Sequence, residues 1–241
     1  MLPVTADGTP DYEFMEKYVA EKRAELLKRY KTFVSKQLAK LEYKSIPKLD
    51  EMEWRVFDFT DIFEVKKGFY NKKPVSDGTG TIPFLGATDS NNGLTRFLTI
   101  EEIEKNSKTG NPPNEPLERK LFPGNAICVT NNGSVGHAYY QIHQFTCSHD
   151  INPLYLKERE LNLPLALFLV KTIEKQGELF QYARKWRPSR MVKSKLLLPT
   201  TSGKPDWEYM EQYTKNMMLK KYNQYLAFLA KQDRKQNKQA K

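Results

Sequence analysis

The sequence predicts an α+β fold in which one mixed α/β domain is carried on two long helices that form an antiparallel, coiled-coil-like pair. Two observations predict this division. A repeat with helical patterning occupies both ends of the chain, and short β-type runs between Gly-, Pro- and Asn-rich turns fill the middle. We expect an N-terminal segment and first helix over residues 1–45, the mixed domain over 46–201, and the second helix with a basic tail over 202–241.

The two long helices are predicted by the repeat. The segment LPVTADGTPDYEFMEKY from Leu2 aligns, after one inserted residue, with LPTTSGKPDWEYMEQY from Leu198. Two pairs of aromatic residues keep the same register further along: Tyr30 with Tyr225, and Phe33 with Phe228. In each copy a Pro-Asp pair provides a stop and an N-cap, so the helices are expected to begin near Asp11 and Asp206.

Apolar residues at heptad spacing follow each predicted start. In the first helix they are Tyr12, Val19, Leu26 and Phe33, flanked by Leu27 and Val34. In the second they are Met218 with Tyr225, Leu219 with Leu226, and Tyr222 with Leu229. Such stripes favour packing against another helix of the same kind, in this chain or a second one, while packing of each helix on its own domain is the alternative.

The middle region reads as strands. The candidate runs are WRVFDFTDIFEV, TIPFLGAT, GLTRFLTI, NAICVTNNGSVGHAYYQI and INPLYL. One helix is expected near residues 163–182, because Leu165, Phe168, Leu169, Ile173 and Leu179 recur at helical spacing.

The charge balance favours a polyanionic partner. Lys and Arg number 39 against 29 Asp and Glu, a formal net charge of +10, and each phosphate neutralised by a basic side chain releases condensed counterions. A solvated Lys-rich face is the alternative, since the tail KQDRKQNKQAK contributes several of these charges. The chain shows neither an apolar stretch long enough to cross a bilayer nor a secretory signal, so we expect no membrane contact and a cytoplasmic location. Cys128 and Cys147 lack metal-binding spacing and are expected to be buried free thiols, with no metal bound.

Two Asn-rich turns are candidates for contact with the bases of a nucleic acid. ATDSNNGLTR supplies Asn91, Asn92 and Arg96, and VTNNGSVGHAYY supplies Asn131, Asn132, Ser134 and His137. An Asn side chain carries a donor and an acceptor and can read adenine in the major groove. The alternative is hairpin-turn chemistry, because Asn and Gly both tolerate positive φ.

Two basic clusters with interleaved aromatic residues are candidates for phosphate contacts. KKGFYNKKP contains Lys66, Lys67, Lys72 and Lys73, and YARKWRPSRMVKSK contains Arg184, Lys185, Arg187 and Arg190 around Trp186. Arginine donates two parallel hydrogen bonds to a phosphate, and most protein contacts to DNA position the duplex in this way. A solvated charged face is again the alternative.

Several longer motifs resemble the specificity subunits of Type I restriction-modification systems and related two-part systems. They are GTIPFLGATDSNNGLT, FPGNAICVTNNGSVGHAYYQ, FTCSHDINPLYLK, ARKWRPSRMVKSKLLLP and the two LP…PD segments, and they cover essentially the whole chain. The resemblance implies that residues 46–201 are a target recognition domain that reads duplex DNA without performing chemistry. It also implies two partners, a methylation subunit that binds S-adenosylmethionine and a restriction subunit that cuts unmodified DNA, while this chain binds no cofactor.

Full-length subunits of that family alternate two recognition domains with two long helices, and each domain reads one half of a bipartite site. This chain has one complete domain with two helices, so it resembles a half subunit or the C-terminal half of a longer one. The resemblance therefore implies a homodimer or pairing with another half subunit.

Three other functions remain as alternatives. A DNA adenine methyltransferase would need a Gly-rich cofactor loop and an Asn-Pro-Pro-Tyr motif, and Asn152-Pro153-Leu154-Tyr155 resembles that motif only superficially. A nuclease would need clustered acidic metal ligands, which Asp89, Asp150 and Glu158 do not provide by their spacing. A non-specific RNA or single-strand binder would also use basic aromatic clusters, and competition between nucleic acids separates it from a duplex reader.

Overall fold

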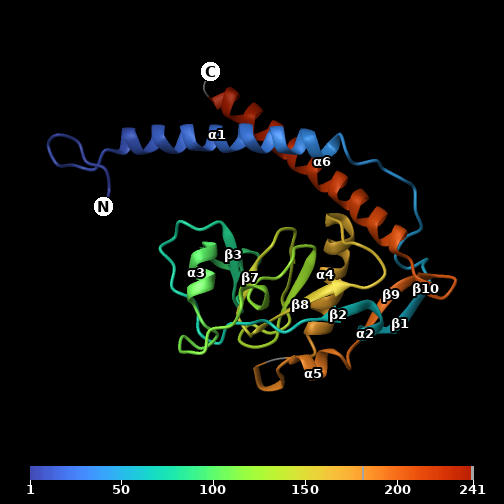
Figure 1. The fold of residues 1–241 in the computed structure, drawn as a ribbon. Coiled ribbons are helices and arrows are strands. Elements are labelled where there is room, and N and C mark those ends of the chain that lie inside the picture. Colours follow the sequence, from blue (N-terminus) through green and yellow to red (C-terminus); the bar gives the residue numbers. More distant parts are fainter. Residues whose placement is uncertain (181, 240–241) are drawn as a thin grey trace. The chain divides into compact units, whose positions relative to one another are not determined.

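The computed structural model describes residues 1–180 and 182–239, except for the side chains of residues 182 and 233–239. It divides into two compact units, Met1–Ser45 with Lys215–Lys241, and Ile46–Thr214, and the boundary falls within the last helix, α6 (Trp207–Gln239). The elements are labelled in Figure 1. The α+β class is confirmed. The predicted basic tail lies mostly outside the described residues, since its side chains are described only as far as Gln232.

Both long helices begin where the sequence predicts. Asp11 caps α1 (Tyr12–Leu38) by accepting a hydrogen bond from the Phe14 N–H at 2.8 Å. Asp206 caps α6 in the same way, accepting from the Tyr209 N–H at 2.9 Å. A carboxylate at this position satisfies an amide that has no partner inside the helix, so the repeated Pro-Asp pair fixes both starts.

The two helices run antiparallel within the helical unit, as predicted. Phe33 of α1 meets Tyr222 of α6 with ring centroids 6.4 Å apart, whereas Arg23 donates to Gln232 at 3.1 Å. Between these contacts the rings of Tyr30 and Tyr225 meet edge to face at 5.0 Å. Tyr30 and Tyr225 are equivalent residues of the repeat, so an approximate two-fold axis relating the helices passes between their rings.

The predicted heptad stripe on α1 is only partly covered by α6. Tyr12, Val19 and Leu26 are 74%, 62% and 61% exposed, whereas Val34 is buried. On α6, Leu229 is buried, and Met218, Leu219, Tyr222 and Leu226 are half-buried. Apolar side chains of both helices line a hollow of about 630 Å³, among them Tyr18, Leu26, Leu27, Tyr30, Tyr225, Phe228 and Leu229. The stripe therefore keeps free apolar surface after α1 and α6 have paired.

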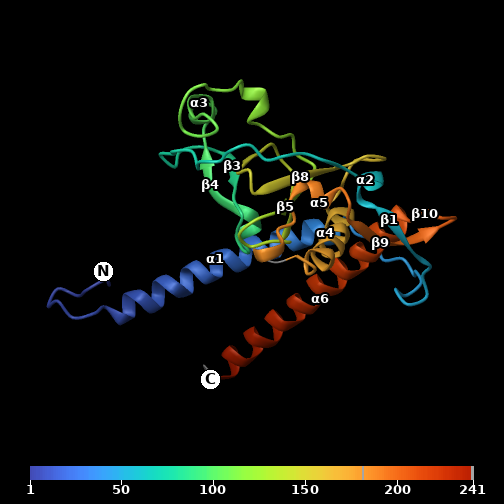
Figure 2. The same ribbon diagram turned by 90° about the horizontal axis from the view of Figure 1, so that it is seen from below.

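The second unit contains three small sheets among its described residues. The four-stranded antiparallel sheet has the order β2 (Phe63–Val65), β8 (Ile151–Leu156), β5 (Ala126–Thr130), β6 (Ala138–Gln141). The next sheet has the order β4 (Leu94–Leu98), β3 (Ile82–Leu85), β7 (Thr146–Cys147), and its first two strands lie side by side in Figure 2. The third joins β1 (Trp54–Asp58), β9 (Lys195–Thr201) and β10 (Lys204–Pro205). The helices of this unit are α2 (Phe59–Ile62), α3 (Ile100–Lys105), α4 (Leu163–Gly177) and α5 (Pro188–Met191), together with the start of α6.

Strand β5 lies between two cores. Every residue of β5 is buried. Alternate side chains point to opposite faces of a strand, and a core covers each face of β5. Ile127 and Val129 belong to the core around α4, whereas Ala126 and Cys128 belong to the core around β3 and β7. The turn that follows β5, beginning at Asn131, therefore emerges from a strand that is held on both sides.

The mixed domain differs from the prediction in several places, and β7, β9, β10 and α5 are elements that were not predicted. The helix expected over 163–182 ends at Gly177, where the backbone meets Gly136 so closely that a Cβ on Gly136 would lie 2.9 Å from the Gly177 Cα. Leu179 consequently lies outside the helix and is exposed. The run from Trp54 is divided by the single turn α2 into two strands. Helix α3 was not predicted, although Thr99 and Glu102 form the capping box that its sequence encodes.

Candidate nucleic-acid interface

The two Asn-Gly turns predicted from the sequence lie next to each other. A Cβ placed on Gly133 of the second turn would lie 3.5 Å from the Ala87 Cβ at the start of the first. Tyr139 of β6 links the two, because its hydroxyl donates to the Thr88 carbonyl at 2.8 Å. Segments about 40 residues apart in the sequence thus form one polar surface at the ends of β3 and β5.

The first turn is fastened to β6. Asn91 and Asn92 adopt φ values of 50° and 52°, which Asn tolerates better than most residues. The Asn92 amide donates to the Tyr140 carbonyl at 3.2 Å, and Gln141 donates back to the Asn92 carbonyl at 3.0 Å. Asn91 donates to the Leu94 carbonyl at 3.1 Å. The side-chain nitrogens of both residues therefore shape the turn, and both side chains remain exposed to solvent.

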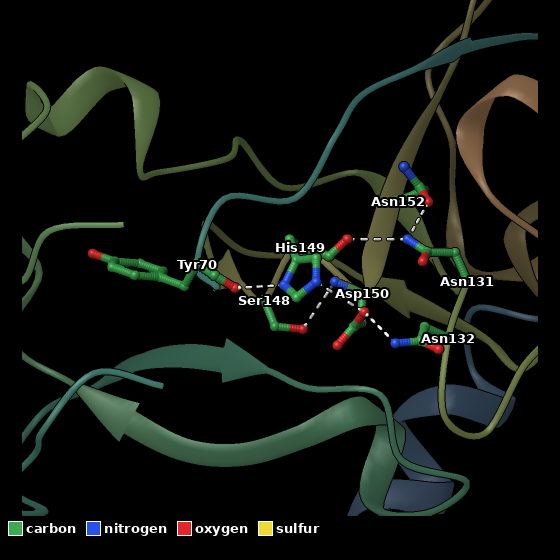
Figure 3. Close-up of polar contacts among 7 residues, drawn as sticks. All are labelled: Tyr70, Asn131, Asn132, Ser148, His149, Asp150 and Asn152. Carbon is green, nitrogen blue, oxygen red and sulfur yellow. Dashed lines mark hydrogen bonds and ion pairs between the residues drawn. The ribbon is translucent and has the colours of Figure 1, made fainter. Parts of the chain in front are cut away.

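Asn131 of the second turn has a supporting role that the sequence prediction missed. It is buried, and its amide donates to the His149 carbonyl at 3.1 Å and to the Asn152 Oδ1 at 2.6 Å. We expected Asn131 to approach the bases, but its burial and its internal hydrogen bonds place it beneath the turn. Asn132 is half-buried and donates to the Asp150 Oδ1 at 2.9 Å (Figure 3).

The residues that hold this turn come from the segment before β8 and from the start of β8 itself. His149 lies with its Nδ1 3.1 Å from the Tyr70 carbonyl and its Nε2 3.3 Å from the Asp150 Oδ1 (Figure 3). Asn152 is buried and donates to the Lys66 carbonyl at 2.8 Å. These residues were not predicted as part of the site. The sequence Ser-His-Asp-Ile-Asn was the only available indication of these residues. It points to polar support of the second turn only when the contact between the two segments is known.

The predicted lysines of the first basic cluster divide into two places, and Arg96 of the first Asn turn contacts the second of them. The backbone of Lys66 joins the network beneath the second turn through Asn152, and Lys67 follows it. Arg96 instead donates to the Pro74 carbonyl at 2.5 Å. Burial and the neighbouring Arg96 charge lower the pKa of Lys73. Lys72 and Lys73 thus lie along the segment that precedes β3, and Arg96 lies on β4.

The second basic cluster surrounds a buried tryptophan. Trp186 is fully buried, stacks on Phe180 at 4.9 Å and donates to Ser194 at 2.9 Å. It is therefore a core residue and is not available to stack on a base, contrary to the interpretation of an aromatic residue interleaved with basic ones. The Arg184 guanidinium lies 5.3 Å from the centroid of the Phe180 ring, and Arg190 donates to the Lys185 carbonyl at 2.9 Å. Arg187 is exposed at the N-cap of α5.

Phe180 connects this cluster to the second turn. It lines a hollow of about 380 Å³ together with Gly136, His137, Lys171 and Glu174. The His137 ring stacks on Tyr139 at 6.5 Å, and burial, with smaller effects of Asp89 and Glu174, raises the pKa of Tyr139 to about 12. Tyr139 therefore stays a neutral hydrogen-bond donor at physiological pH. His137 of the second turn and Phe180, over whose ring the Arg184 guanidinium lies, accordingly line the same hollow.

The cysteines and the acidic residues do not form a metal site in the part of the chain that the structure describes. Cys128 and Cys147 are buried free thiols, and burial raises the pKa of both. Residues 1–180 and 182–232 contain no group of three or more His, Cys, Asp or Glu side chains that could hold a metal ion. None of the helices within these residues is long and apolar enough to cross a bilayer.

Known proteins match this chain along most of its length. The family model described as Type I restriction modification DNA specificity domain matches residues 51–227. The specificity subunit S.BcgI of a Type II restriction enzyme from Heyndrickxia coagulans is 30% identical over 218 residues, which cover 90% of this chain and 57% of that protein.

Two crystal structures are also similar. The HsdS subunit from Thermoanaerobacter tengcongensis is 14% identical with a TM-score of 0.44, covering 90% of this chain and 49% of that one. The Type I S subunit from M. genitalium is 17% identical with a TM-score of 0.45, covering 91% and 50%. The chain thus spans about half the length of the proteins that it matches.

Proposed function

The chain belongs to the Type I restriction-modification DNA specificity domain family, and from this premise we propose that it reads one half of a duplex DNA target for a restriction-modification complex. The observation that carries the proposal is the joint surface of the two Asn turns. It combines exposed polar side chains with basic residues on a chain of formal net charge +10. Polar groups that face base edges supply sequence information, and basic groups hold the phosphates.

We assign base contacts and phosphate contacts to different residues. Asn91, Asn132 and the neighbouring Ser134 and His137 lie on the turns and are the candidates for base edges. The phosphate candidates are basic residues at or near the same surface: Lys66, Lys67, Arg184, Lys185, Arg187 and Arg190. Lys72, Lys73 and Arg96 are candidates for a separate backbone contact along β4.

We propose that the chain performs no chemistry and works with a methylation subunit and a restriction subunit. In this arrangement S-adenosylmethionine binds to the methylation subunit, and the recognition domain over residues 46–201 only places that subunit on its site. The cytoplasm is the expected location, where these partners and DNA meet.

The repeat supports a second recognition domain at the other end of the helix pair. At the start of α6, Met210 and Tyr209 are buried, and Met210 belongs to the core of the mixed domain. Their equivalents in the repeat are Met15 and Phe14 of α1, and Phe14 is 50% exposed. We propose that a second recognition domain covers this end of α1, contributed by a second copy in a homodimer or by another half subunit. The partly uncovered heptad stripe provides further apolar surface for such pairing.

Selection from a random duplex library tests the proposal. The chain, assembled with its methylation subunit, should enrich a bipartite motif, and single-stranded DNA or RNA should compete poorly. Equal competition by all three nucleic acids would instead support the non-specific binder. Tritium transfer from S-adenosylmethionine to DNA by the chain alone would refute the non-catalytic role.

A further inference from the structure

Asp150 makes side-chain contacts that the second turn does not need for its backbone shape. Its carboxylate reaches the Asn132 Nδ2 and the His149 Nε2. The turn itself is closed by other hydrogen bonds. The Thr130 N–H donates to the His137 carbonyl at 2.9 Å, the Gly136 N–H donates to the Thr130 carbonyl at 3.0 Å, and the Asn131 N–H donates to the Asp150 backbone carbonyl at 2.8 Å. The carboxylate therefore acts on the side chain of Asn132 and not on the path of the chain.

A carboxylate fixes which way an amide points. The two ends of an Asn side chain are nearly identical in shape, so only hydrogen-bond partners decide which end is the oxygen. An ionised carboxylate only accepts, so the Asn132 nitrogen must face Asp150 and the Asn132 oxygen must point away. The His149 Nε2 lies 3.3 Å from the same Asp150 Oδ1, and the His149 Nδ1 lies 3.1 Å from the Tyr70 carbonyl (Figure 3).

The orientation leaves Asn132 with a defined outer edge. One Nδ2 hydrogen is bonded to Asp150, and the side chain keeps a second N–H and the Oδ1 for another partner. Adenine offers a complementary pair in the major groove, the N7 acceptor and the N6 donor, whereas thymine offers the O4 acceptor in place of the N6 donor. An Asn that holds its oxygen toward the adenine N6 thus accepts adenine and rejects thymine, while an Asn free to flip can turn its nitrogen toward the thymine O4 and tolerates both.

We infer that Asp150 is a specificity-determining positioning residue, which holds Asn132 as a reader of one adenine in the target. The inference rests on the proposed function, since it assigns one base of the duplex to one side chain. It adds a residue that touches no DNA and still decides the sequence that is read.

The Asp150→Asn variant tests the inference, because an amide in place of this carboxylate can accept or donate and no longer fixes the orientation of Asn132. The complex of the full chain with its methylation subunit is used to select from a random duplex library, and the enriched sequences are compared with those of the wild type. We expect one adenine position to lose preference over thymine, by at most the factor of about 5 to 150 that a bidentate contact provides. All other positions should be unchanged.

Three variants serve as controls. Asp77→Asn removes the same charge from an exposed loop, where Asp77 caps the Thr79 N–H at 2.8 Å, and should leave the motif intact. Asp150→Glu keeps a carboxylate and should retain the adenine preference. Asn132→Ala should lose the same position as Asp150→Asn, and combining the two changes should add nothing further.

The outcomes separate this inference from the proposed function. A folded Asp150→Asn variant that keeps its full adenine preference would overturn the inference. An Asn132→Ala variant with an unchanged motif would overturn it too, and this second test holds even if Asp150→Asn does not fold. If both variants lost the base preference at every position of the motif, the inference would also be overturned, because the network would then be only structural. A wild-type complex that enriches no motif would refute the proposed function itself.

Discussion

Replacing Lys120 by Met should destabilise the recognition domain more than any change to an exposed lysine. Lys120 is fully buried, and its Nζ donates to the carbonyls of Ile103, Glu104 and Asn106 at 3.0, 3.0 and 2.9 Å and to the Asn114 Oδ1 at 2.6 Å. The ammonium thus holds the C-terminal end of α3 and the loop that follows. Burial lowers the pKa of Lys120, although Glu115 and Glu104 oppose this effect.

The expected loss follows from these contacts. A hydrogen bond from a charged donor contributes about 1.5–3 kcal/mol. The Ile103 carbonyl keeps a second donor, the Tyr70 hydroxyl at 3.2 Å, and the Glu104 carbonyl keeps the Asn114 Nδ2 at 2.6 Å. The exposed Asn114 can bind water through its oxygen. The loss therefore concentrates on the Asn106 carbonyl, from which the Tyr70 hydroxyl lies 3.5 Å away, and this gives about 1.5–3 kcal/mol for one such bond. Met is unbranched and similar in length, so little of this loss should come from a cavity.

Urea unfolding of the two proteins, followed by circular dichroism, measures the difference in unfolding free energy. Lys105→Met on the exposed side of α3 is the matched control and should change the free energy of unfolding by less than about 0.5 kcal/mol. If Lys120→Met costs less than about 1 kcal/mol with an unchanged m-value, the ammonium is not what holds this loop, and the reasoning above is wrong.

Three further predictions concern DNA binding, target spacing and pH. Arg184→Ala should weaken binding to all duplexes alike and reduce the salt slope of log K by about 0.9, which binding at several salt concentrations measures; a change in motif would contradict a phosphate role. Deleting residues 16–22 of α1 should shorten its free end by about 10 Å and the target spacer by about three base pairs, without altering either half-site, and methylation mapping decides this. The free energy of unfolding should fall as pH rises above the ordinary thiol pKa of 9.0, because burial raises the folded pKa of Cys128 and Cys147 and only the unfolded chain loses those protons. Each thiol should contribute about 1.4 kcal/mol per pH unit, and unfolding of Cys128→Ala should show a smaller slope.

Local patterns predicted the long elements of this fold well. The Pro-Asp pairs located the starts of α1 and α6 because an N-cap acts within four residues of its own position. The antiparallel pairing of the helices followed from their apolar stripes. Helix α4 was placed correctly at its start, but its end was not, since the contact between Gly177 and Gly136 depends on a turn more than 40 residues earlier.

The site was harder to predict because its side chains have internal partners far away in the sequence. Asn131 and Asn132 are adjacent residues of the same type. Asn131 is buried and donates to Asn152, whereas Asn132 is half-buried and donates to Asp150. Trp186 has basic neighbours in sequence and apolar neighbours in space. Residue type indicates what a side chain can bond to, while strand pairing decides which partner it has, and pairing of β5 with β8 cannot be deduced from either strand alone.

The contact between Tyr30 and Tyr225 carries a consequence for how the helix pair could arise. If the two copies of the repeat were identical, one residue would determine both sides of this contact and would have to be compatible with itself. A lysine or glutamate there would have faced its own charge at close range, which is repulsive. A tyrosine ring avoids this conflict, because the electropositive edge of one ring can rest on the electronegative face of its twin, as the edge-to-face geometry at 5.0 Å shows. An aromatic residue at the axis thus permits a single ancestral segment to pair with its own duplicate before either copy has changed.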